Sequence, residues 1–100
     1  MSKKPETLFA QKVDKDLSTL KNAWFENIKQ VGIRCTPDRI GCVNKWFVGI
    51  ELKVNQNKPT PLQNLKLNKI RQAGGKAYTA TPLSWKSIFR ELKELDQSII

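Results

Sequence analysis

Two segments of the chain carry apolar residues at the spacing of an amphipathic helix. The first runs from Pro5 to Leu20 and the second from Pro82 onward. In both, apolar side chains recur every three or four positions and therefore share one face of a helix. These positions are Phe9, Val13, Leu17 and Leu20 in the first segment and Trp85, Ile88, Phe89, Leu92 and Leu95 in the second. The pattern predicts two helices, each with one buried face.

Four shorter segments are rich in β-branched and aromatic residues and predict strands. They are 23–28, 37–43, 46–54 and 76–81. Only Asn44 and Lys45 separate the second segment from the third, which is typical of a tight β-hairpin. Because side chains alternate between the two faces of a strand, Glu51 and Lys53 are expected on the same face.

A third helix is predicted from Pro61 to Ala73. Thr60 is suited to the N-cap, Pro61 to the first turn and Gln63 to a capping box, and Gly74 follows the expected end. We expect its buried stripe to consist of Leu62, Leu65, Ile70 and Ala73. The order of elements, αβββαβα, predicts a single α/β domain over all 100 residues, with a mixed sheet flanked by helices.

The composition excludes several classes of protein. Without any histidine, the chain has no Ser-His triad, no Cys-His dyad and no histidine-containing zinc site. In an extended stretch, Cys35 and Cys42 would lie ~20 Å apart, beyond the ~7 Å Cα separation that a disulfide allows. No segment approaches the ~18 apolar residues of a membrane span, and the amino terminus has no apolar signal region, so a cytoplasmic protein is expected.

Positive charge is concentrated in the middle of the chain. The net charge is +9, and residues 29–76 contain ten basic side chains and two acidic ones, a local excess of +8. The segments before and after this block are close to neutral. A basic block of this kind favours a polyanionic partner such as DNA, although a solvated basic face is the simpler alternative.

The two acidic residues of the basic block are predicted to face each other. A two-residue hairpin at Asn44 and Lys45 pairs residues whose numbers sum to 89, so Asp38 lies opposite Glu51. Like charges in directly opposed positions repel, and a divalent cation would offset the repulsion. Mg²⁺ is suited to this role because it binds one or two carboxylates together with water and substrate phosphate oxygens. Lys53 would reach the same cavity and could orient an attacking water.

At these residues the chain resembles a known family. Pro37-Asp38, twelve intervening residues and Glu51-Leu52-Lys53 match the signature of the PD-(D/E)xK nuclease superfamily. The downstream Pro61-Leu62-Gln63 and the helix that ends at two glycines are similar to its VRR-NUC branch. The chain departs from the usual pattern in lacking a glycine just before Pro37 and in having Arg39 where an apolar residue is usual.

The resemblance implies a restriction-endonuclease-like core and cleavage of DNA that depends on Mg²⁺ or Mn²⁺. Asp38 and Glu51 would bind the metal with the backbone carbonyl of Leu52, Lys53 would be the catalytic lysine, and Gln63 would face the same cleft. Glu6 stands where the family's first helix carries an acidic residue that can complete the site. A capping box accounts equally for Gln63, and the helix dipole accounts equally for Glu6.

The leading hypothesis is a structure-selective endonuclease that acts on duplex or branched DNA such as a four-way junction. The basic residues that we expect to contact DNA are Arg34, Arg39, Lys58, Lys66, Lys69 and Arg71. A homodimer is expected because two symmetric copies can cut both strands, with Trp24, Phe25 or the first helix as candidate interface. The expected location is the cytoplasm of a bacterial or phage-infected cell. The alternatives are a non-catalytic nucleic-acid-binding module and a basic interaction protein.

Overall fold

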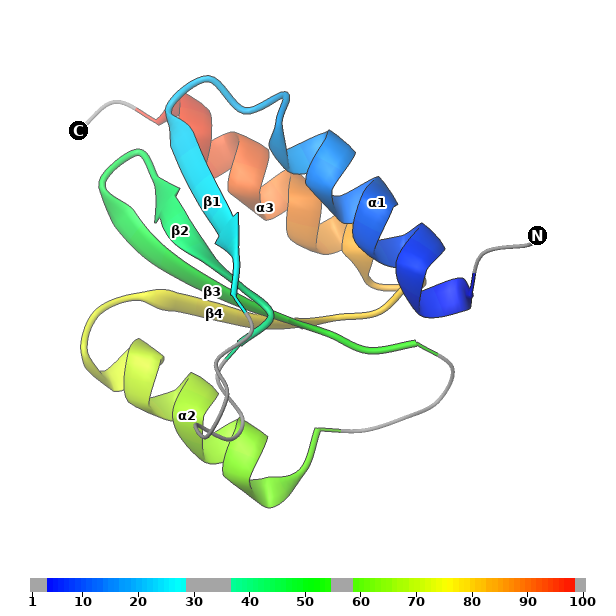
Figure 1. Ribbon diagram of the computed structural model, residues 1–100. Helices are drawn as coiled ribbons and strands as arrows, with labels where there is room; N and C mark the ends of the chain where they lie inside the picture. The colour runs from blue at the N-terminus through cyan, green and yellow to red at the C-terminus, as the bar shows by residue number, and fades with distance from the viewer. Residues whose placement is uncertain (1–3, 29–36, 55–58, 99–100) are drawn as a thin grey trace.

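A computed structural model describes residues 4–28, 37–54 and 59–98. Strands β1 (Ala23–Asn27), β2 (Arg39–Val43) and β3 (Trp46–Leu52) pair antiparallel in that order, and β4 (Lys76–Ala80) pairs parallel with β3. Helices α1 (Pro5–Leu17) and α3 (Trp85–Gln97) lie side by side on one face of this sheet, and α2 (Pro61–Gln72) lies on the other (Figure 1). The α/β class and the predicted order of elements are confirmed. No helix in the described ranges is long and apolar enough to cross a membrane.

The main hydrophobic core lies between the sheet and the helix pair α1 and α3. Its buried side chains come from both helices, from three of the strands and from the segments next to them. They are Phe9, Val13, Leu17, Leu20, Val43, Val48, Ile50, Val54, Ala80, Trp85, Ile88 and Leu92. The apolar faces predicted for the two terminal helices are therefore confirmed, and burial of these faces supplies most of the hydrophobic stabilisation of the fold.

The β2–β3 hairpin has the predicted register, with Val43 opposite Trp46 and Gly41 opposite Val48. Both turn residues have positive φ angles, 48° at Asn44 and 78° at Lys45, as a type I′ turn requires. The Asn44 side chain also donates from Nδ2 to the carbonyl oxygens of Leu95 (3.0 Å) and Ser98 (2.7 Å). The turn is thus tied to the carboxyl end of α3.

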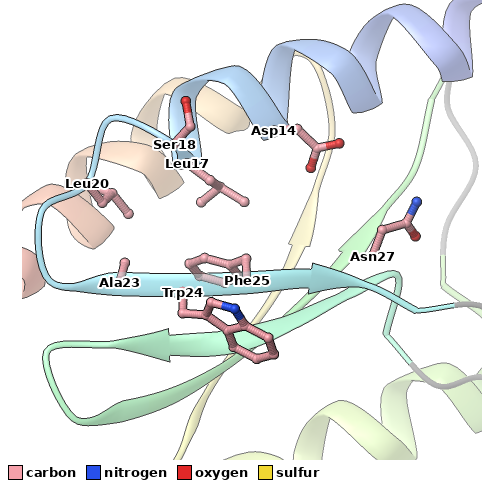
Figure 2. Close-up of a pocket in the computed structure, with 8 residues that line it drawn as sticks. All are labelled: Asp14, Leu17, Ser18, Leu20, Ala23, Trp24, Phe25 and Asn27. Carbon is pink, nitrogen blue, oxygen red and sulfur yellow. The ribbon is translucent and has the colours of Figure 1, made fainter.

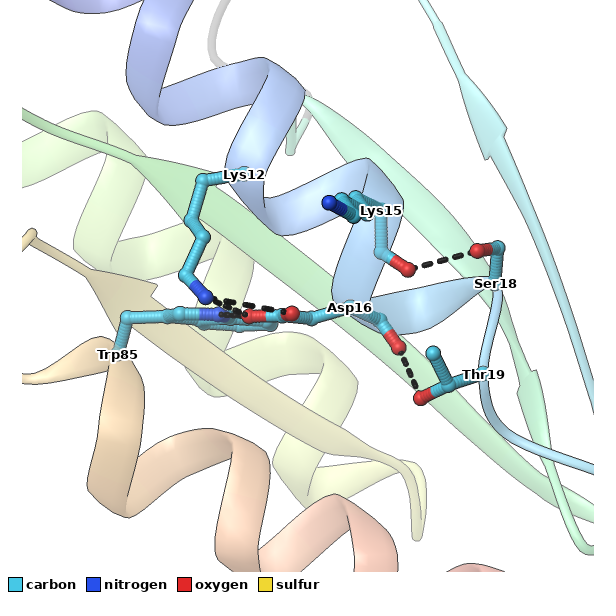
Figure 3. Close-up of polar contacts among 6 residues, drawn as sticks. All are labelled: Lys12, Lys15, Asp16, Ser18, Thr19 and Trp85. Carbon is cyan, nitrogen blue, oxygen red and sulfur yellow. Dashed lines mark hydrogen bonds and ion pairs between the residues drawn. The ribbon is translucent and has the colours of Figure 1, made fainter.

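A buried polar contact joins α1 to α3. The indole Nε1 of Trp85 donates to Asp16 Oδ2 at 2.8 Å, and Lys12 forms an ion pair with the same carboxylate at 3.2 Å (Figure 3). Beyond Leu17 the chain turns, and the hydroxyls of Ser18 and Thr19 donate to carbonyl oxygens of the last helical turn. The first helix therefore ends earlier than the predicted Leu20, although Leu20 remains buried.

The buried stripe predicted for α2 is wrong at Leu62, Leu65 and Ala73, which are exposed, and right at Ile70. Leu67, by contrast, is 2% exposed, and Ile70 packs against the sheet. The contact depends on a glycine: a Cβ atom at Gly49 would lie 2.9 Å from Ile70 Cδ1. The helix is rotated relative to the prediction, and the sheet-facing positions are Gln63, Lys66, Leu67 and Ile70, which also have helical spacing.

Asp96 is a buried acid whose role the sequence pattern does not indicate. It is 5% exposed and accepts hydrogen bonds from two consecutive backbone amides, Lys21 N–H (2.9 Å) and Asn22 N–H (2.6 Å). Its own carbonyl oxygen accepts from Asn22 Nδ2 at 3.1 Å. Because these donors precede β1, Asp96 fixes the start of the edge strand to α3.

We expect Asp96→Ala to lower the free energy of unfolding by about 2–4 kcal/mol, because it leaves two amides without their charged acceptor. Asp96→Asn, which keeps an acceptor oxygen, should lower it less. Exposed Gln97→Ala on the same helix is the matched control and should change it by less than about 0.5 kcal/mol. Urea denaturation measures all three, and equal effects of Asp96→Ala and Gln97→Ala would contradict the assigned role.

Candidate active site

Asp38 and Glu51 meet at the open end of the β2–β3 hairpin. The last paired residues are Arg39 and Ile50, and the two acids follow directly, in the predicted register. The Asp38 carbonyl oxygen accepts from Ile28 N–H at 3.1 Å, so pairing with the first strand extends to this residue. Its carboxylate Oδ2 accepts from Leu52 N–H at 2.8 Å. The main chain of Asp38 is thus fixed from one neighbouring strand and its side chain from the other.

Glu51 is buried beside this carboxylate, with 6% of its surface exposed. Burial, a hydrogen bond with Asp38 and repulsion by the Asp38 charge together raise the pKa of Glu51 from 4.5 to about 8, and the nearby Lys53 ammonium lowers it in part. Near neutral pH Glu51 therefore keeps its proton, because ionising it in a buried position beside the Asp38 carboxyl group is unfavourable.

Gln63 and Lys53 lie beside Glu51. Gln63 Nε2 donates to Glu51 Oε1 at 3.5 Å, the long limit of a hydrogen bond. The same side chain accepts from Thr60 N–H through Oε1 at 2.9 Å, and Thr60 Oγ1 accepts from Gln63 N–H at 3.1 Å. Gln63 thus belongs to the capping box and to the site at once. Lys53 is half-buried, one residue beyond the end of β3, where its N–H donates to Ala80 O.

Glu6 lines the same hollow as Asp38 and Leu52, between the start of α1 and the ends of β1 and β2. The hollow has a volume of about 540 Å³. In the described part of the chain no three acidic or cysteine side chains gather closely enough to hold a metal ion, and the role of Glu6 as a further ligand stays a prediction. Leu52 contacts Asp38 through its N–H group, and a metal contact of its carbonyl oxygen remains a prediction.

The basic residues expected to contact DNA fall into four groups. Lys66 is half-buried and Lys69 exposed on α2, and both stay candidates. Arg71 docks α2 on the sheet by donating from Nη2 to Ala77 O at 2.8 Å. Arg34 and Lys58 lie outside the described residues. The expectation for Arg39 needs correction: its side chain is buried and both arms of its guanidinium group are engaged within the protein, so it is not presented to a phosphate.

The first strand presents one of the two aromatic residues named for a dimer interface. Trp24 is 59% exposed and points away from α1, whereas Phe25 points toward α1 and packs against the core (Figure 2). A hollow of about 360 Å³ separates β1 from α1, and Asp14 and Asn27 stand together at one of its ends (Figure 2). Both residues also line the hollow beside Asp38. The homodimer itself stays a prediction.

A second basic surface lies on α3, and the distribution of charge along the sequence did not predict it. Lys86, Arg90 and Lys93 line one hollow of about 460 Å³ together with Phe89, and Lys93 Nζ lies 5.7 Å from the centre of the Phe89 ring. The segment is formally neutral because its three basic residues are matched by Glu91, Glu94 and Asp96. Asp96 is buried, so the exposed surface of the helix carries an excess of positive charge even though Glu94 lines the same hollow. The spacing of three and four residues between the basic side chains is the signal that could have identified this surface.

Comparisons with known proteins leave the family open: no protein-family model matches the chain, and no curated protein matches its sequence.

The raised pKa of Glu51 predicts how the free energy of unfolding depends on pH. Between pH 4.5 and about 8 the folded protein keeps a proton on Glu51 that the unfolded chain has released. The free energy of unfolding should therefore fall as the pH rises through this interval, by up to ~1.4 kcal/mol per pH unit. Glu51→Gln should remove this component, because glutamine does not titrate.

Urea denaturation from pH 5 to 8.5 in the presence of a chelator measures both slopes. The chain contains no histidine, so few other side chains change charge in this interval. Glu94→Gln, an exposed site on α3, is the control and should retain the slope of the parent protein. Identical slopes for the parent protein and Glu51→Gln would contradict the description of the pair.

Proposed function

We propose that this protein is a nuclease that hydrolyses phosphodiester bonds of DNA with Mg²⁺ or Mn²⁺ bound by Asp38 and Glu51. One observation carries the proposal: two acidic side chains from adjacent strands converge at a largely buried position inside a basic segment. When both carboxylates of such a pair ionise, their repulsion lowers the free energy of unfolding. A destabilising arrangement of this kind is expected at a functional site, and here a bound cation would offset the repulsion.

The residues present fit a hard divalent cation. The site offers carboxylate oxygens from two fixed backbone positions, and Mg²⁺ takes one or two carboxylates while it keeps water and binds substrate phosphate. The chain has no imidazole, and among the residues that the structure describes the site has no thiol that would favour a softer metal. When bound, the cation would supply charge stabilisation for the phosphoryl oxygens. Glu6 and the Leu52 carbonyl would be further ligands in the arrangement that the family resemblance implies.

Lys53, which lines a hollow with Glu6 and Phe9 of α1, and Gln63 on α2 would both act on the substrate. The ammonium group of Lys53 would orient the attacking water and balance the negative charge that develops on the phosphoryl group. Gln63 would hold Glu51 and donate to the substrate or to water. In the reaction the oxygen of water bonds to phosphorus as the bond to the leaving sugar oxygen breaks, and the proton lost by water is replaced by one taken up at the leaving oxygen.

The fold supports the family assignment that the sequence suggests. A four-stranded mixed sheet in the order αβββαβα is compatible with a PD-(D/E)xK core, and the signature residues lie at the ends of the two strands where such a site is expected. The same proposal includes branched DNA as a substrate and a homodimer whose two sites make paired cuts. Several large apolar side chains are exposed and available for a second copy, among them Trp24 on β1, Leu8 on α1 and Leu62 and Leu65 on α2.

Purified protein should cut DNA only when Mg²⁺ or Mn²⁺ is added. Asp38→Asn, Glu51→Gln and Lys53→Met should each lower the cleavage rate by at least about a hundredfold, because each removes several kcal/mol of transition-state stabilisation. Gel assays on linear, supercoiled, flapped and four-way-junction DNA measure the rates. Glu94→Gln is the control and should cut normally.

Cleavage that persists at the parent rate in Asp38→Asn or Glu51→Gln would show that the site is wrongly assigned. Tight binding of DNA with no cleavage of any substrate would favour the alternative of a non-catalytic binding module.

Binding to DNA in Ca²⁺, which permits docking with little hydrolysis, should weaken steeply as salt is added. Lys66→Gln and Lys69→Gln should each make the slope of log affinity against log salt shallower by about one unit if the side chain contacts a phosphate. Lys15→Gln, on the far side of the sheet in α1, is the control. An affinity that does not depend on salt would contradict the polyanion interpretation.

A further inference from the structure

Arg39 is the only arginine in the described ranges that is buried, with 5% of its surface exposed. Its guanidinium group binds the Asp14 carboxylate with two parallel hydrogen bonds, from Nε to Oδ1 at 2.7 Å and from Nη2 to Oδ2 at 3.0 Å. Asp14 lies on α1, 25 positions earlier in the chain. The pair therefore connects Arg39, the first residue of β2, to helix α1.

The remaining arm of the same guanidinium group reaches the candidate site. Arg39 Nη1 donates to the carbonyl oxygen of Asp38 at 3.1 Å. Because the guanidinium group is planar and rigid, fixing two of its nitrogens on Asp14 also fixes the third. The main chain of Asp38 is thus coupled to the position of α1.

Stability alone does not account for this arrangement. A buried ion pair contributes little net stability, since the cost of removing the charges from water offsets their attraction, and apolar residues of similar size are often as good or better. Only the Arg39 side of the pair is buried: Asp14 is exposed, with 52% of its side chain accessible, and it lines the hollow beside Asp38 together with Arg39. The pair stands next to the candidate site rather than in the main core.

We propose that Arg39 and Asp14 are positioning residues that hold Asp38 where its carboxylate can bind the cation together with Glu51. The proposal rests on the proposed function for the role of the cation. Its structural part, that the pair sets the place of Asp38, is independent of catalysis. In the absence of metal, that place is reported by the hydrogen bond from Leu52 N–H to Asp38 Oδ2.

Three variants separate positioning from folding. Asp14→Asn keeps the shape of the side chain but loses the charge. Arg39→Met keeps an apolar stem that suits a buried position. Asp14→Glu keeps the carboxylate and should restore much of the effect. Lys12→Met is the matched control, because it breaks an ion pair on the same helix that does not reach Asp38.

Hydrogen exchange of the Leu52 amide, measured by NMR with a chelator present, tests the structural part. We expect exchange to be about tenfold faster in Asp14→Asn and Arg39→Met, because the amide loses a well-placed charged acceptor. The amides of Val48 and Ile50 in the same strand should keep the exchange rates of the parent protein, and Lys12→Met should change none of them.

Titration with Mn²⁺, followed by electron paramagnetic resonance, tests the functional part. We expect Asp14→Asn and Arg39→Met to bind Mn²⁺ about 10- to 100-fold more weakly, as is usual when a residue that orients a metal ligand is lost. Excess Mn²⁺ should then restore part of the cleavage rate, which would not happen if the variants were merely unfolded.

Unchanged Leu52 exchange and unchanged Mn²⁺ affinity in both variants would overturn the proposal. If the parent protein neither binds Mn²⁺ nor cuts DNA, the proposed function fails, whereas faster Leu52 exchange in the same variants would still support the positioning of Asp38. Normal Mn²⁺ affinity in Arg39→Met together with active parent protein would overturn the positioning role alone.

Discussion

The repulsion between Asp38 and Glu51 is the constraint around which the candidate site is organised. The type I′ turn at Asn44 and Lys45 fixes the register of the hairpin, and the register brings the two acids together at its open end. The Leu52 amide holds one carboxylate, burial surrounds the other, and the pKa of Glu51 rises to about 8 as a result. A proton relieves the repulsion in the free protein, and a divalent cation would relieve it more completely where phosphate is to be bound.

The two faces of the sheet contribute differently to this site. The face covered by α1 and α3 contains the main core and provides the rigid support, including the Arg39–Asp14 pair that reaches Asp38. The opposite face is covered by α2, which is anchored by Leu67 and by the contact of Ile70 with Gly49. Through this contact α2 places Gln63 beside Glu51 and exposes Lys69, while Lys66 is half-buried. In the proposed function an extended polyanion would lie along this helix.

Local sequence signals were sufficient for the order of elements and for the register of the hairpin. The two-residue length of the turn predicts the register of the hairpin, and the register places Asp38 opposite Glu51. Neither step requires information about the rest of the fold. The buried stripe of α2 was right at Ile70 but wrong in its leucines, because Leu62, Leu65 and Leu67 are equally hydrophobic and only the contact with the sheet selects Leu67. The side that faces the sheet depends on where Gly49 allows close approach, and this belongs to a different element.

The roles of Arg39 and Asp96 could not be predicted for a related reason. Arg39 is part of the basic block in sequence, but its partner Asp14 lies on α1 and becomes its neighbour only in the folded chain. In the sequence, Asp96 is one of several acids on the polar face of a predicted helix. Its distinct role arises only in the folded chain, where the segment before β1 packs against it. In the same way, folding turned a neutral carboxyl-terminal segment into a helix with a basic surface.

The most direct measurement is X-ray diffraction from crystals of the protein soaked in Mn²⁺, with data collected at a wavelength where manganese scatters anomalously. The account predicts an anomalous peak between the carboxylates of Asp38 and Glu51, about 2.1 Å from an oxygen of each, and no peak at this position in crystals of Glu51→Gln. An empty site in the parent protein at saturating Mn²⁺, or a peak that persists unchanged in Glu51→Gln, would contradict it.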